Sequence, residues 1–251
     1  IAKAPTGTGK TFAYGIPIVE HIDPEDESVQ AVILAPTREL AIQITDEIRD
    51  LAAFKPGVRT VCLYGGAPIG RQIETLKKHP QIVVATPGRL MDHMKRRTIR
   101  LHKVETVVLD EADRMLDMGF IKDVTRILKQ IPHRRNLGMF SATISREVMD
   151  ISWVYQRDAA EITVREDEQN KPDIKQFRMD VPHDGKADAI ERILNETGFD
   201  RCMAFCNTKG STERITKFLQ MLGIYAECIN GDIPQRKREQ VMDKFRRGEL
   251  R

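Results

Sequence analysis

A glycine-containing loop near the start of the chain combines residue types that suit phosphate binding. The segment reads Ala4-Pro-Thr-Gly-Thr-Gly-Lys10-Thr11, and a helical pattern begins near Phe12. Such a loop presents backbone N–H groups and a helix N-terminus to an anion. Lys10 can place its charge on the β- and γ-phosphates of a nucleotide, and the Thr11 hydroxyl can coordinate magnesium. The alternative is an ordinary glycine-rich turn, because the usual pattern begins with glycine and this one begins with Ala4.

A second polar segment, Asp110-Glu-Ala-Asp113, follows the apolar run Val107 to Leu109. A carboxylate at a strand end can face the phosphate loop from a neighbouring strand and hold magnesium, and Glu111 is then placed to polarise the attacking water. The alternative is that these residues only start the next helix, whose dipole favours acidic side chains. Phosphoryl transfer depends on positioning and charge neutralisation, so each segment strengthens the interpretation of the other.

These two segments need a scaffold that brings loops together, and the apolar pattern predicts one. Short apolar runs at 31–34, 82–84 and 107–109 are typical of strands buried on both faces. Helical spacing follows the first run at Leu40, Ile44, Ile48 and Leu51, and the third run at Phe120, Val124, Ile127 and Ile131. Strands that alternate with helices predict an α/β fold with a parallel sheet, which binds ligands at the carboxyl ends of its strands.

A polar stretch at residues 165–172, which ends in proline, predicts a linker between two domains. We therefore expect one domain over residues 1–164 and a second over residues 173–251. In the second, residues 174–181 alternate, 203–205 predict a buried strand, and helices are expected over 190–194, 208–222 and 235–245. These are too few strands for a complete α/β domain, so we expect the second domain to be truncated.

The composition argues against several classes of protein. Hydrophobic residues make up 41% and charged residues 31% of the 251 residues, which favours folded domains over disorder. The 40 basic and 37 acidic residues leave a net charge of +3, so nucleic acid is not bound by bulk charge. The cysteines at 62, 202, 206 and 228 form no CxxC pair, which argues against zinc and favours buried, reduced thiols in the cytoplasm. No apolar stretch is long enough for a membrane span.

The order and spacing of the motifs resemble the DEAD-box RNA helicases of helicase superfamily two over essentially the whole chain. That family's ATP loop matches Ala4 to Thr11, including the alanine start. The other matching segments are Pro36-Thr-Arg-Glu-Leu40, Gly65-Gly66, Thr86-Pro-Gly-Arg89, Val108 to Phe120, Ser141-Ala-Thr143, Phe205-Cys-Asn-Thr208, and Gly231-Asp232 with Gln235 to Arg238. Asn230 departs from the family, where a histidine commonly precedes the Gly-Asp pair. The resemblance implies two RecA-like parallel-sheet domains of P-loop NTPase type in tandem.

The resemblance also implies roles for individual residues. ATP would be bound by Thr6, Gly7, Thr8, Gly9, Lys10 and Thr11, and Mg²⁺ by Thr11 and Asp110. Lys10, Asp110 and Glu111 would be catalytic, with Ser141 and Thr143 coupling the ATP state to domain closure. Single-stranded RNA would be held through its phosphates by Thr37, Arg38, Gly66, Thr86, Gly88, Arg89, Thr208, Gln235 and Arg238. Taken alone, Arg38 also fits a surface helix cap, and Arg238 a solvated helix face.

The resemblance implies ATP-dependent local separation of RNA strands by the parent protein. The family's adenine-reading glutamine segment would precede residue 1, and two motifs, one with arginines that reach the γ-phosphate, would follow residue 251. We therefore expect the segment alone to bind ATP weakly, hydrolyse it poorly and unwind no duplex. Flanking tails would bind protein or ribonucleoprotein partners. Two alternatives are a non-catalytic RNA-binding module, which intact Lys10, Asp110 and Glu111 disfavour, and a DNA-directed translocase, which Asp113 in place of histidine disfavours.

Overall fold

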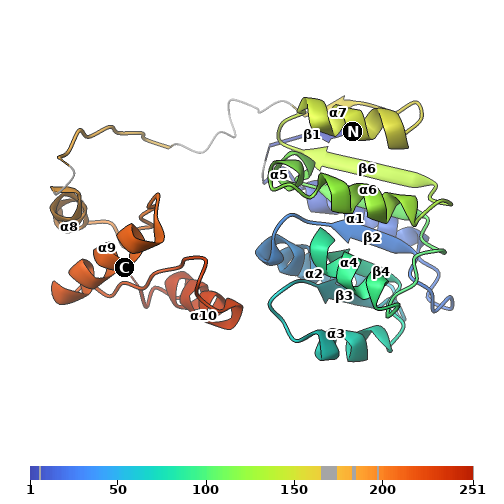
Figure 1. Ribbon diagram of the computed structural model, residues 1–251, viewed down its shortest axis with the longest axis horizontal. Helices are drawn as coiled ribbons and strands as arrows, with labels where there is room; N and C mark the ends of the chain where they lie inside the picture. Colours follow the sequence, from blue (N-terminus) through green and yellow to red (C-terminus); the bar gives the residue numbers. More distant parts are fainter. Residues whose placement is uncertain (6, 165–173, 183–184, 197, 251) are drawn as a thin grey trace. The chain divides into compact units, whose positions relative to one another are not determined.

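The computed structural model describes residues 1–5, 7–164, 174–182, 185–196 and 198–250 of the chain (Figure 1). Its contacts divide the chain into two units, Ile1–Pro172 and Asp173–Arg251, called unit 1 and unit 2. The linker predicted at 165–172 lies outside the described residues, so its conformation stays a prediction.

In the described part of unit 1, seven strands form one sheet in which every pairing is parallel. Its order is β3-β4-β2-β5-β6-β1-β7. The strands are β1 (Ala2–Lys3), β2 (Ala31–Leu34), β3 (Thr60–Leu63), β4 (Ile82–Ala85), β5 (Thr106–Asp110), β6 (Asn136–Ser141) and β7 (Ile162–Thr163). The three predicted apolar runs are the adjacent strands β4, β2 and β5. They need no polar alternation because both faces of this sheet are covered.

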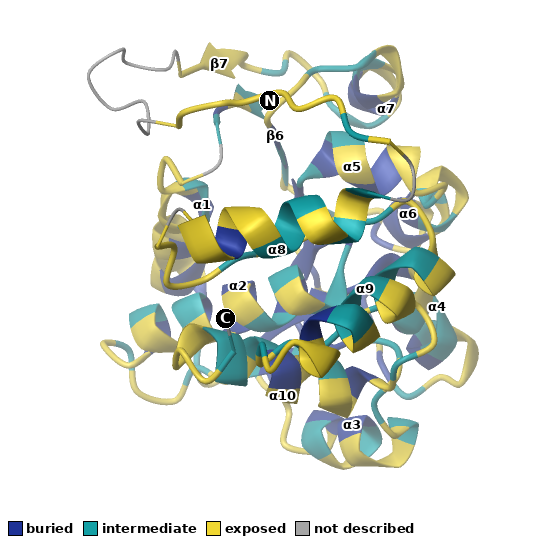
Figure 2. Ribbon diagram, turned by 90° about the vertical axis from the view of Figure 1, so that its left-hand side faces the viewer, coloured by how far each residue is buried: buried dark blue, intermediate teal, exposed yellow. Residues whose placement is uncertain are grey.

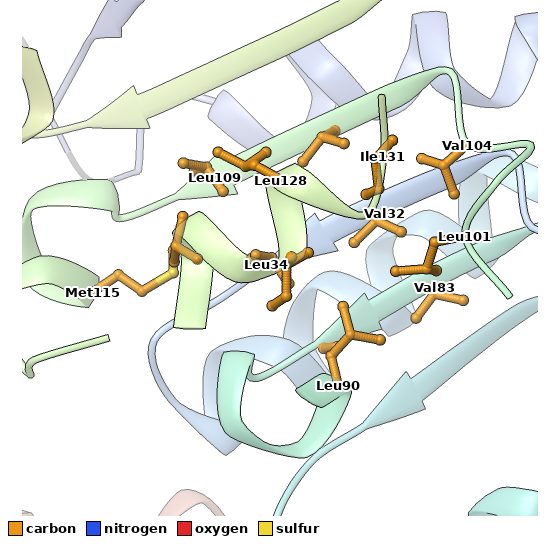
Figure 3. Close-up of a cluster of buried hydrophobic side chains, with 14 of the residues drawn as sticks. Val32, Leu34, Val83, Leu90, Leu101, Val104, Leu109, Met115, Leu128 and Ile131 are labelled. Atoms are coloured by element: carbon orange, nitrogen blue, oxygen red, sulfur yellow. The ribbon is translucent and has the colours of Figure 1, made fainter. Parts of the chain in front are cut away.

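Helices cover both faces of the sheet, as the strand–helix alternation predicts (Figure 1). Side chains on β2 alternate between two apolar layers: Val32 and Leu34 belong to one, and Ala31 and Ile33 to the other. The first layer, part of which is drawn in Figure 3, includes residues of α3 (Ile69–Leu76), α4 (Pro87–Lys95), α5 (Ala112–Asp117), α6 (Ile121–Lys129) and α7 (Arg146–Tyr155). The second includes residues of α1 (Lys10–His21) and α2 (Arg38–Ala52). Because helices cover both faces of the sheet, we expect ligands to bind at the loops that follow the carboxyl ends of the strands.

Unit 2 contains α8 (Lys186–Glu196), α9 (Lys209–Met221) and α10 (Gln235–Arg246), which confirms its predicted helices. In Figure 2 these helices are coloured mainly exposed or intermediate, and each has only one or two buried residues. The predicted buried strand at 203–205 is wrong, since the side chains of Met203 and Phe205 are 53% and 94% exposed. A parallel strand is buried only between paired neighbours, and no strand is assigned among the described residues of unit 2.

All four cysteines are free thiols, and each is intermediate in exposure rather than buried as predicted. For Cys202 and Cys206 the reason is the missing strand pairing at 203–205. An apolar cavity of about 340 Å³ lies beside this segment and is lined by residues that include Leu194, Leu219 and Val241. Burial raises the pKa of the Cys62 thiol to about 11, so this thiol stays protonated at neutral pH. None of the helices in the described residues has the length and apolar character of a membrane span.

Candidate nucleotide and nucleic-acid site

The loop between β1 and α1 exposes its backbone. Gly7 and Gly9 have φ angles of 83° and 81°, in the left-handed region that glycine enters without steric cost. A Cβ atom added at either glycine would meet no atom within 4 Å, so the loop opens on free space. Among the described residues no side chain caps α1, so its first N–H groups can donate hydrogen bonds to an anion. The Thr8 hydroxyl donates to the Pro5 carbonyl oxygen at 2.8 Å, and Thr6 lies outside the described residues.

Lys10 folds back over this loop. Its Nζ atom donates a hydrogen bond of 3.1 Å to the Ala4 carbonyl oxygen. A phosphate oxygen is a stronger acceptor for an ammonium group than a neutral carbonyl, because both partners then carry charge. The lysine is therefore held beside the loop by a contact that a nucleotide phosphate can replace.

Asp110, at the end of β5, faces the phosphate loop from the sheet and is 3% exposed. Its Oδ2 atom accepts a 2.8 Å hydrogen bond from the Tyr14 hydroxyl, and its Oδ1 atom accepts one of 2.9 Å from the Glu111 N–H. Burial raises the pKa of the Asp110 carboxyl, and the Tyr14 and Glu111 hydrogen bonds and the charge of Lys10 oppose this rise. Burial and the charge of Asp110 raise the pKa of Tyr14, and a hydrogen bond with Thr11 opposes it. Tyr14 thus joins α1, whose first turn holds Lys10 and Thr11, to Asp110.

The strand arrangement corrects one expectation. Asp110 was expected to face the phosphate loop from a neighbouring strand, but β6 lies between β1 and β5. Phe140 of β6 pairs with Ala2 on one side and with Asp110 on the other. Its ring also packs edge-on against Tyr14, with 5.0 Å between the ring centroids. The strand that carries the phosphate loop is therefore separated from the strand that carries Asp110 by one intervening strand, β6.

Thr11 and Asp110 fit a magnesium ion. Mg²⁺ prefers oxygen ligands and in nucleotide sites takes one or two from the protein, with phosphates and waters supplying the others. No group of three or more His, Cys, Asp or Glu side chains that could hold a metal occurs in the described residues. One buried carboxylate and one hydroxyl match the small number of protein ligands that Mg²⁺ takes in nucleotide sites. The burial that raises the pKa of Asp110 also makes a nearby cation favourable.

Glu111 adopts a backbone conformation that few residues other than glycine enter, with φ 46° and ψ 52°. Such strained residues cluster at functional sites. Its carboxylate forms an ion pair of 3.1 Å with Arg114, whose side chain is 60% exposed. The Glu111 side chain is 23% exposed, and water screens the pair from the Arg114 side, so this carboxylate can exchange Arg114 for a water molecule.

Ser141 and Thr143, predicted to couple ATP binding to domain closure, both bind Asp113. Thr143 donates to the Asp113 Oδ2 atom from its N–H at 3.1 Å and from its hydroxyl, and the Asp113 N–H donates to the Ser141 hydroxyl at 3.3 Å. Burial alone would raise the pKa of the Asp113 carboxyl, but hydrogen bonds from Ser141, Thr143 and the Arg114 amide outweigh it and lower that pKa. The segment after β6 is thereby fastened to the first turn of α5.

The predicted RNA-binding residues of unit 1 follow β2, β3 and β4 at the same edge of the sheet. Thr37 caps α2 by accepting the Leu40 N–H at 3.3 Å. Arg38 lies over Gly66, where an added Cβ would come within 2.5 Å of its Nη1 atom. After β4, Thr86 is buried, Gly88 is exposed and Arg89 is half-buried. The sheet order separates these loops from those of β5, β6 and β1, so one half of the edge carries the candidate RNA residues and the other half the nucleotide residues.

The three predicted RNA-binding residues of unit 2 have local structural contacts. Thr208 caps α9 by accepting the Ser211 N–H at 3.2 Å. Gln235, the first residue of α10, is buried and donates to Glu239 at 3.3 Å. Arg238 donates to the carbonyl oxygens of Ile233 at 3.1 Å and Asn230 at 2.8 Å, which holds the turn that precedes α10. Their role toward RNA stays a prediction.

Several residues of the site were not predicted from the sequence. They are Tyr14, the carboxylate of Asp113 as an acceptor, Phe140, and the buried pair Gln72 and His93. Tyr14 had a usable signal, because it lies four residues after Lys10 and therefore on the same side of the helix. The others depend on contacts between distant parts of the chain.

The parallel sheet and its phosphate loop define a nucleotide-binding α/β protein of the P-loop type. The sequence profile described as "DEAD/DEAH box helicase" matches residues 1–151, and that described as "Helicase conserved C-terminal domain" matches residues 185–251. The chain belongs to the DEAD/DEAH box helicase family.

Curated relatives and solved structures support this assignment. The chain is 43% identical over 250 residues to the DEAD-box ATP-dependent RNA helicase CshA of Bacillus cereus, and 44% identical over 250 residues to the ATP-dependent RNA helicase CshA of Listeria monocytogenes. It covers 47% and 48% of those proteins, so it spans about half their length. The crystal structure of a DEAD box protein from Methanococcus jannaschii matches 100% of this chain and 67% of its own, with 39% identity and a TM-score of 0.63. A hypothetical ATP-dependent RNA helicase from Sulfolobus tokodaii matches 99% of this chain and 70% of its own, with 31% identity and a TM-score of 0.60.

Proposed function

We propose that this chain is the core of an ATP-dependent RNA helicase that uses ATP–Mg²⁺ to separate short stretches of RNA duplex or to remodel RNA–protein complexes. The observation that carries the proposal is the 2.8 Å hydrogen bond from the Tyr14 hydroxyl to Asp110, which joins α1, the helix that follows the phosphate loop, to the acidic segment. Around it lie a cationic side chain, an open glycine loop and a second carboxylate. These are the parts that phosphoryl transfer needs, since catalysis of that reaction is mainly positioning and charge stabilisation.

Each residue of unit 1 that is predicted to bind the nucleotide or to act in catalysis has a defined task in the proposed ATP hydrolysis. The glycine loop and the N-terminus of α1 bind the phosphates, and Lys10 neutralises charge on the β- and γ-phosphates. Thr11 and Asp110 hold the magnesium ion, which supplies charge neutralisation when it is bound with ATP. Glu111, freed from Arg114, orients and polarises the attacking water. Ser141 and Thr143 report the state of the site through Asp113.

RNA would bind at the other half of the same sheet edge. Arg38 and Arg89 can contact phosphates, and the N–H group of the exposed Gly88 can do so without reading a base. Thr208, Gln235 and Arg238 are the corresponding candidates in unit 2. ATP and RNA together would draw two RecA-like domains, over 1–164 and 173–251, around one bent strand, and hydrolysis would release it.

The proposal is tested by measuring ATP hydrolysis by the full-length protein with no nucleic acid, with single-stranded RNA and with single-stranded DNA of the same sequence. We expect magnesium-dependent hydrolysis that RNA stimulates and DNA does not. Lys10→Ala should abolish it, because the charge beside the β- and γ-phosphates is lost. Equal stimulation by DNA would favour a DNA-directed translocase, and RNA binding without hydrolysis would favour a non-catalytic binding module; either result refutes the proposal.

A further inference from the structure

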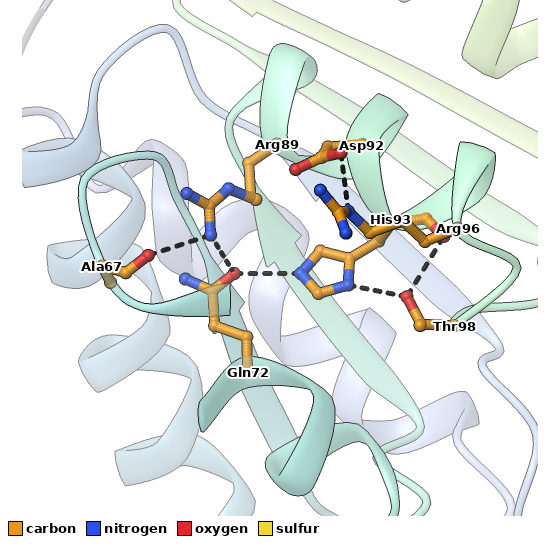
Figure 4. A network of polar contacts seen from close by, with 7 residues as sticks. All are labelled: Ala67, Gln72, Arg89, Asp92, His93, Arg96 and Thr98. Carbon is orange, nitrogen blue, oxygen red and sulfur yellow. Dashed lines mark hydrogen bonds and ion pairs between the residues drawn. The ribbon is translucent and has the colours of Figure 1, made fainter. Parts of the chain in front are cut away.

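A buried polar network lies beneath the candidate RNA-binding loops and takes no part in the proposed nucleotide chemistry (Figure 4). At its centre are Gln72 of α3, 6% exposed, and His93 of α4, fully buried. The Gln72 Oε1 atom lies 3.1 Å from Arg89 Nη1 and 3.0 Å from His93 Nε2. Burying two polar side chains costs free energy unless their hydrogen bonds are satisfied. An apolar pair at the same place would avoid this cost, so the polar pair points to a further role.

The hydrogen bonds fix the orientation of the Gln72 amide. Its Nε2 atom donates to the Tyr64 carbonyl oxygen at 2.9 Å, so its Oε1 atom is the acceptor on the side of Arg89 and His93. His93 must then donate from Nε2. In the neutral ring its Nδ1 atom is an acceptor, 2.8 Å from the Thr98 hydroxyl, whose single proton can go either to Nδ1 or to the His93 carbonyl oxygen at 3.1 Å. Burial, followed by the nearby Arg89 charge, lowers the pKa of His93, which keeps the ring neutral in this arrangement. The donors and acceptors around Gln72 are therefore assigned, and the Thr98 hydroxyl proton has two alternative acceptors on His93.

The network also fixes the position of the Arg89 guanidinium. Arg89 Nη1 donates to Gln72 Oε1 and, at 3.1 Å, to the carbonyl oxygen of Ala67 in the loop after β3. Both hydrogen bonds use Nη1. Among the described residues the Nε and Nη2 atoms of Arg89 have no hydrogen-bond partner, and these two atoms form the edge of arginine that binds a phosphate in bidentate fashion.

We propose that Gln72 is a positioning residue for RNA binding, which holds Arg89 against the loop after β3 so that the Nε–Nη2 edge meets an RNA phosphate, while His93 holds Gln72 in turn. The proposal rests on the RNA-binding role proposed above. It adds that the loops after β3 and β4 act as one unit, because Gln72 joins Tyr64 and Arg89, which follow these two strands. A flexible arginine loses rotamer entropy when it binds a phosphate, and an arginine that is already held in position loses less.

The test is a double-mutant cycle on the full-length protein, with binding of a labelled single-stranded polyuridine measured beside a non-hydrolysable ATP analogue. Gln72→Met keeps the side-chain volume but removes both the acceptor for Arg89 and the donor to the Tyr64 carbonyl oxygen, and it should raise the Kd for polyuridine about fivefold. Arg89→Ala should raise it about tenfold, and the double variant should match Arg89→Ala, because Gln72 acts only through Arg89. The Kd of Gln72→Met for ATP in the absence of RNA should equal that of the wild type.

A matched control separates positioning from loss of a buried glutamine. Gln81 is fully buried, accepts the Arg59 N–H at 2.9 Å and donates to the Pro24 carbonyl oxygen at 3.2 Å. It precedes β4, at the opposite end of that strand from Arg89, so Gln81→Met should lower stability without changing the Kd for polyuridine. His93→Gln, which keeps a donor near the Nε2 position, should bind polyuridine more tightly than His93→Leu.

Two results would overturn the inference: a Kd for Gln72→Met equal to that of the wild type, or a double variant about fiftyfold weaker than wild type, as additive effects require. Failure of the proposed function looks different, because wild-type protein would then show neither polyuridine binding nor RNA-stimulated hydrolysis. If Gln72→Met does not fold, the comparison of His93→Gln with His93→Leu decides in its place, and equal affinities for polyuridine would overturn the inference.

Discussion

The Asp113 carboxylate accepts two hydrogen bonds from Thr143, one from its backbone N–H and one from its hydroxyl. Asp113 lies in the first turn of α5, and Thr143 lies two residues beyond β6. The two segments that flank the candidate metal site are therefore joined by side-chain contacts as well as by the sheet. A change in one segment must displace the other or break this pair.

Thr143→Val removes the hydroxyl bond to Asp113 and keeps the backbone one. We expect duplex unwinding to fall more than ATP hydrolysis, with a loss of about 1 kcal/mol in the free energy of unfolding. Unwinding per ATP hydrolysed measures this. Thr75→Val, which removes a local bond to Arg71 in α3, is the control. Equal losses of unwinding and hydrolysis would contradict the coupling role of Thr143.

Glu111→Gln should leave binding of ATP and RNA intact and lower kcat by about a hundredfold or more, because an amide cannot accept the proton of the attacking water. The backbone conformation of residue 111 is unchanged by this substitution, so stability should stay close to that of the wild type. Equilibrium binding beside single-turnover hydrolysis measures both. A variant that no longer binds ATP would show that Glu111 has a different role.

Tyr14→Phe deletes the hydroxyl that donates to Asp110. We expect a loss of about 1.5–3 kcal/mol in the free energy of unfolding, because a buried carboxylate loses a hydrogen bond. With that bond gone, the pKa of Asp110 should rise further, so the acid limb of the ATPase pH profile should move to higher pH. Urea unfolding and a kcat/KM pH profile measure the two effects. An unmoved acid limb would mean that Asp110 does not control it.

Asp110→Asn tests the effect of a buried charge on stability. Burial raises the pKa of Asp110 above its usual 3.8, so the folded state binds this proton more tightly than the unfolded state. Stability from this group therefore falls as the pH rises through the range above 3.8. In urea unfolding, we expect the stability of the variant relative to the wild type to increase from about pH 4 to about pH 7. Magnesium-dependent hydrolysis by the variant should be lost. A pH-independent difference would contradict the raised pKa.

Gly66→Ala should weaken RNA binding and leave ATP binding unchanged. Its Cβ would come within 2.5 Å of Arg38 Nη1, and its φ of 90° disfavours any other residue, so Arg38 must move. The strain should cost about 1–2 kcal/mol of stability. Gly70→Ala is the control, because its Cβ would meet no atom within 4 Å and alanine favours the helix. Unchanged RNA affinity in Gly66→Ala would contradict the role of this loop.

The parallel sheet of unit 1 could be predicted because the runs 31–34, 82–84 and 107–109, in its adjacent strands β2, β4 and β5, are short and wholly apolar and alternate with amphipathic helices. The phosphate loop and Asp110 could be predicted because their residue types follow strand ends directly. Gln72 and His93 gave no such signal: a buried polar pair has no spacing in the sequence, and it becomes visible only when α3 and α4 lie together.

The error at residues 203–205 has a different cause. An apolar run shows that a segment can be buried, but the partners that bury it lie elsewhere in the chain. In unit 1, β2 pairs with β4 and β5 on its two sides. In unit 2, Phe205 has no paired strand beside it in the described residues and is 94% exposed.

Because all strands of the sheet are parallel, the candidate nucleotide and RNA contacts lie at the carboxyl ends of the strands, and the amino ends form the opposite side of the sheet. Lys103, exposed in the turn before β5, lies at that far edge. A dye or tether attached through Lys103→Cys would sit a strand's length away from Asp110. Single molecules could thus be anchored and watched there while the working edge stays accessible.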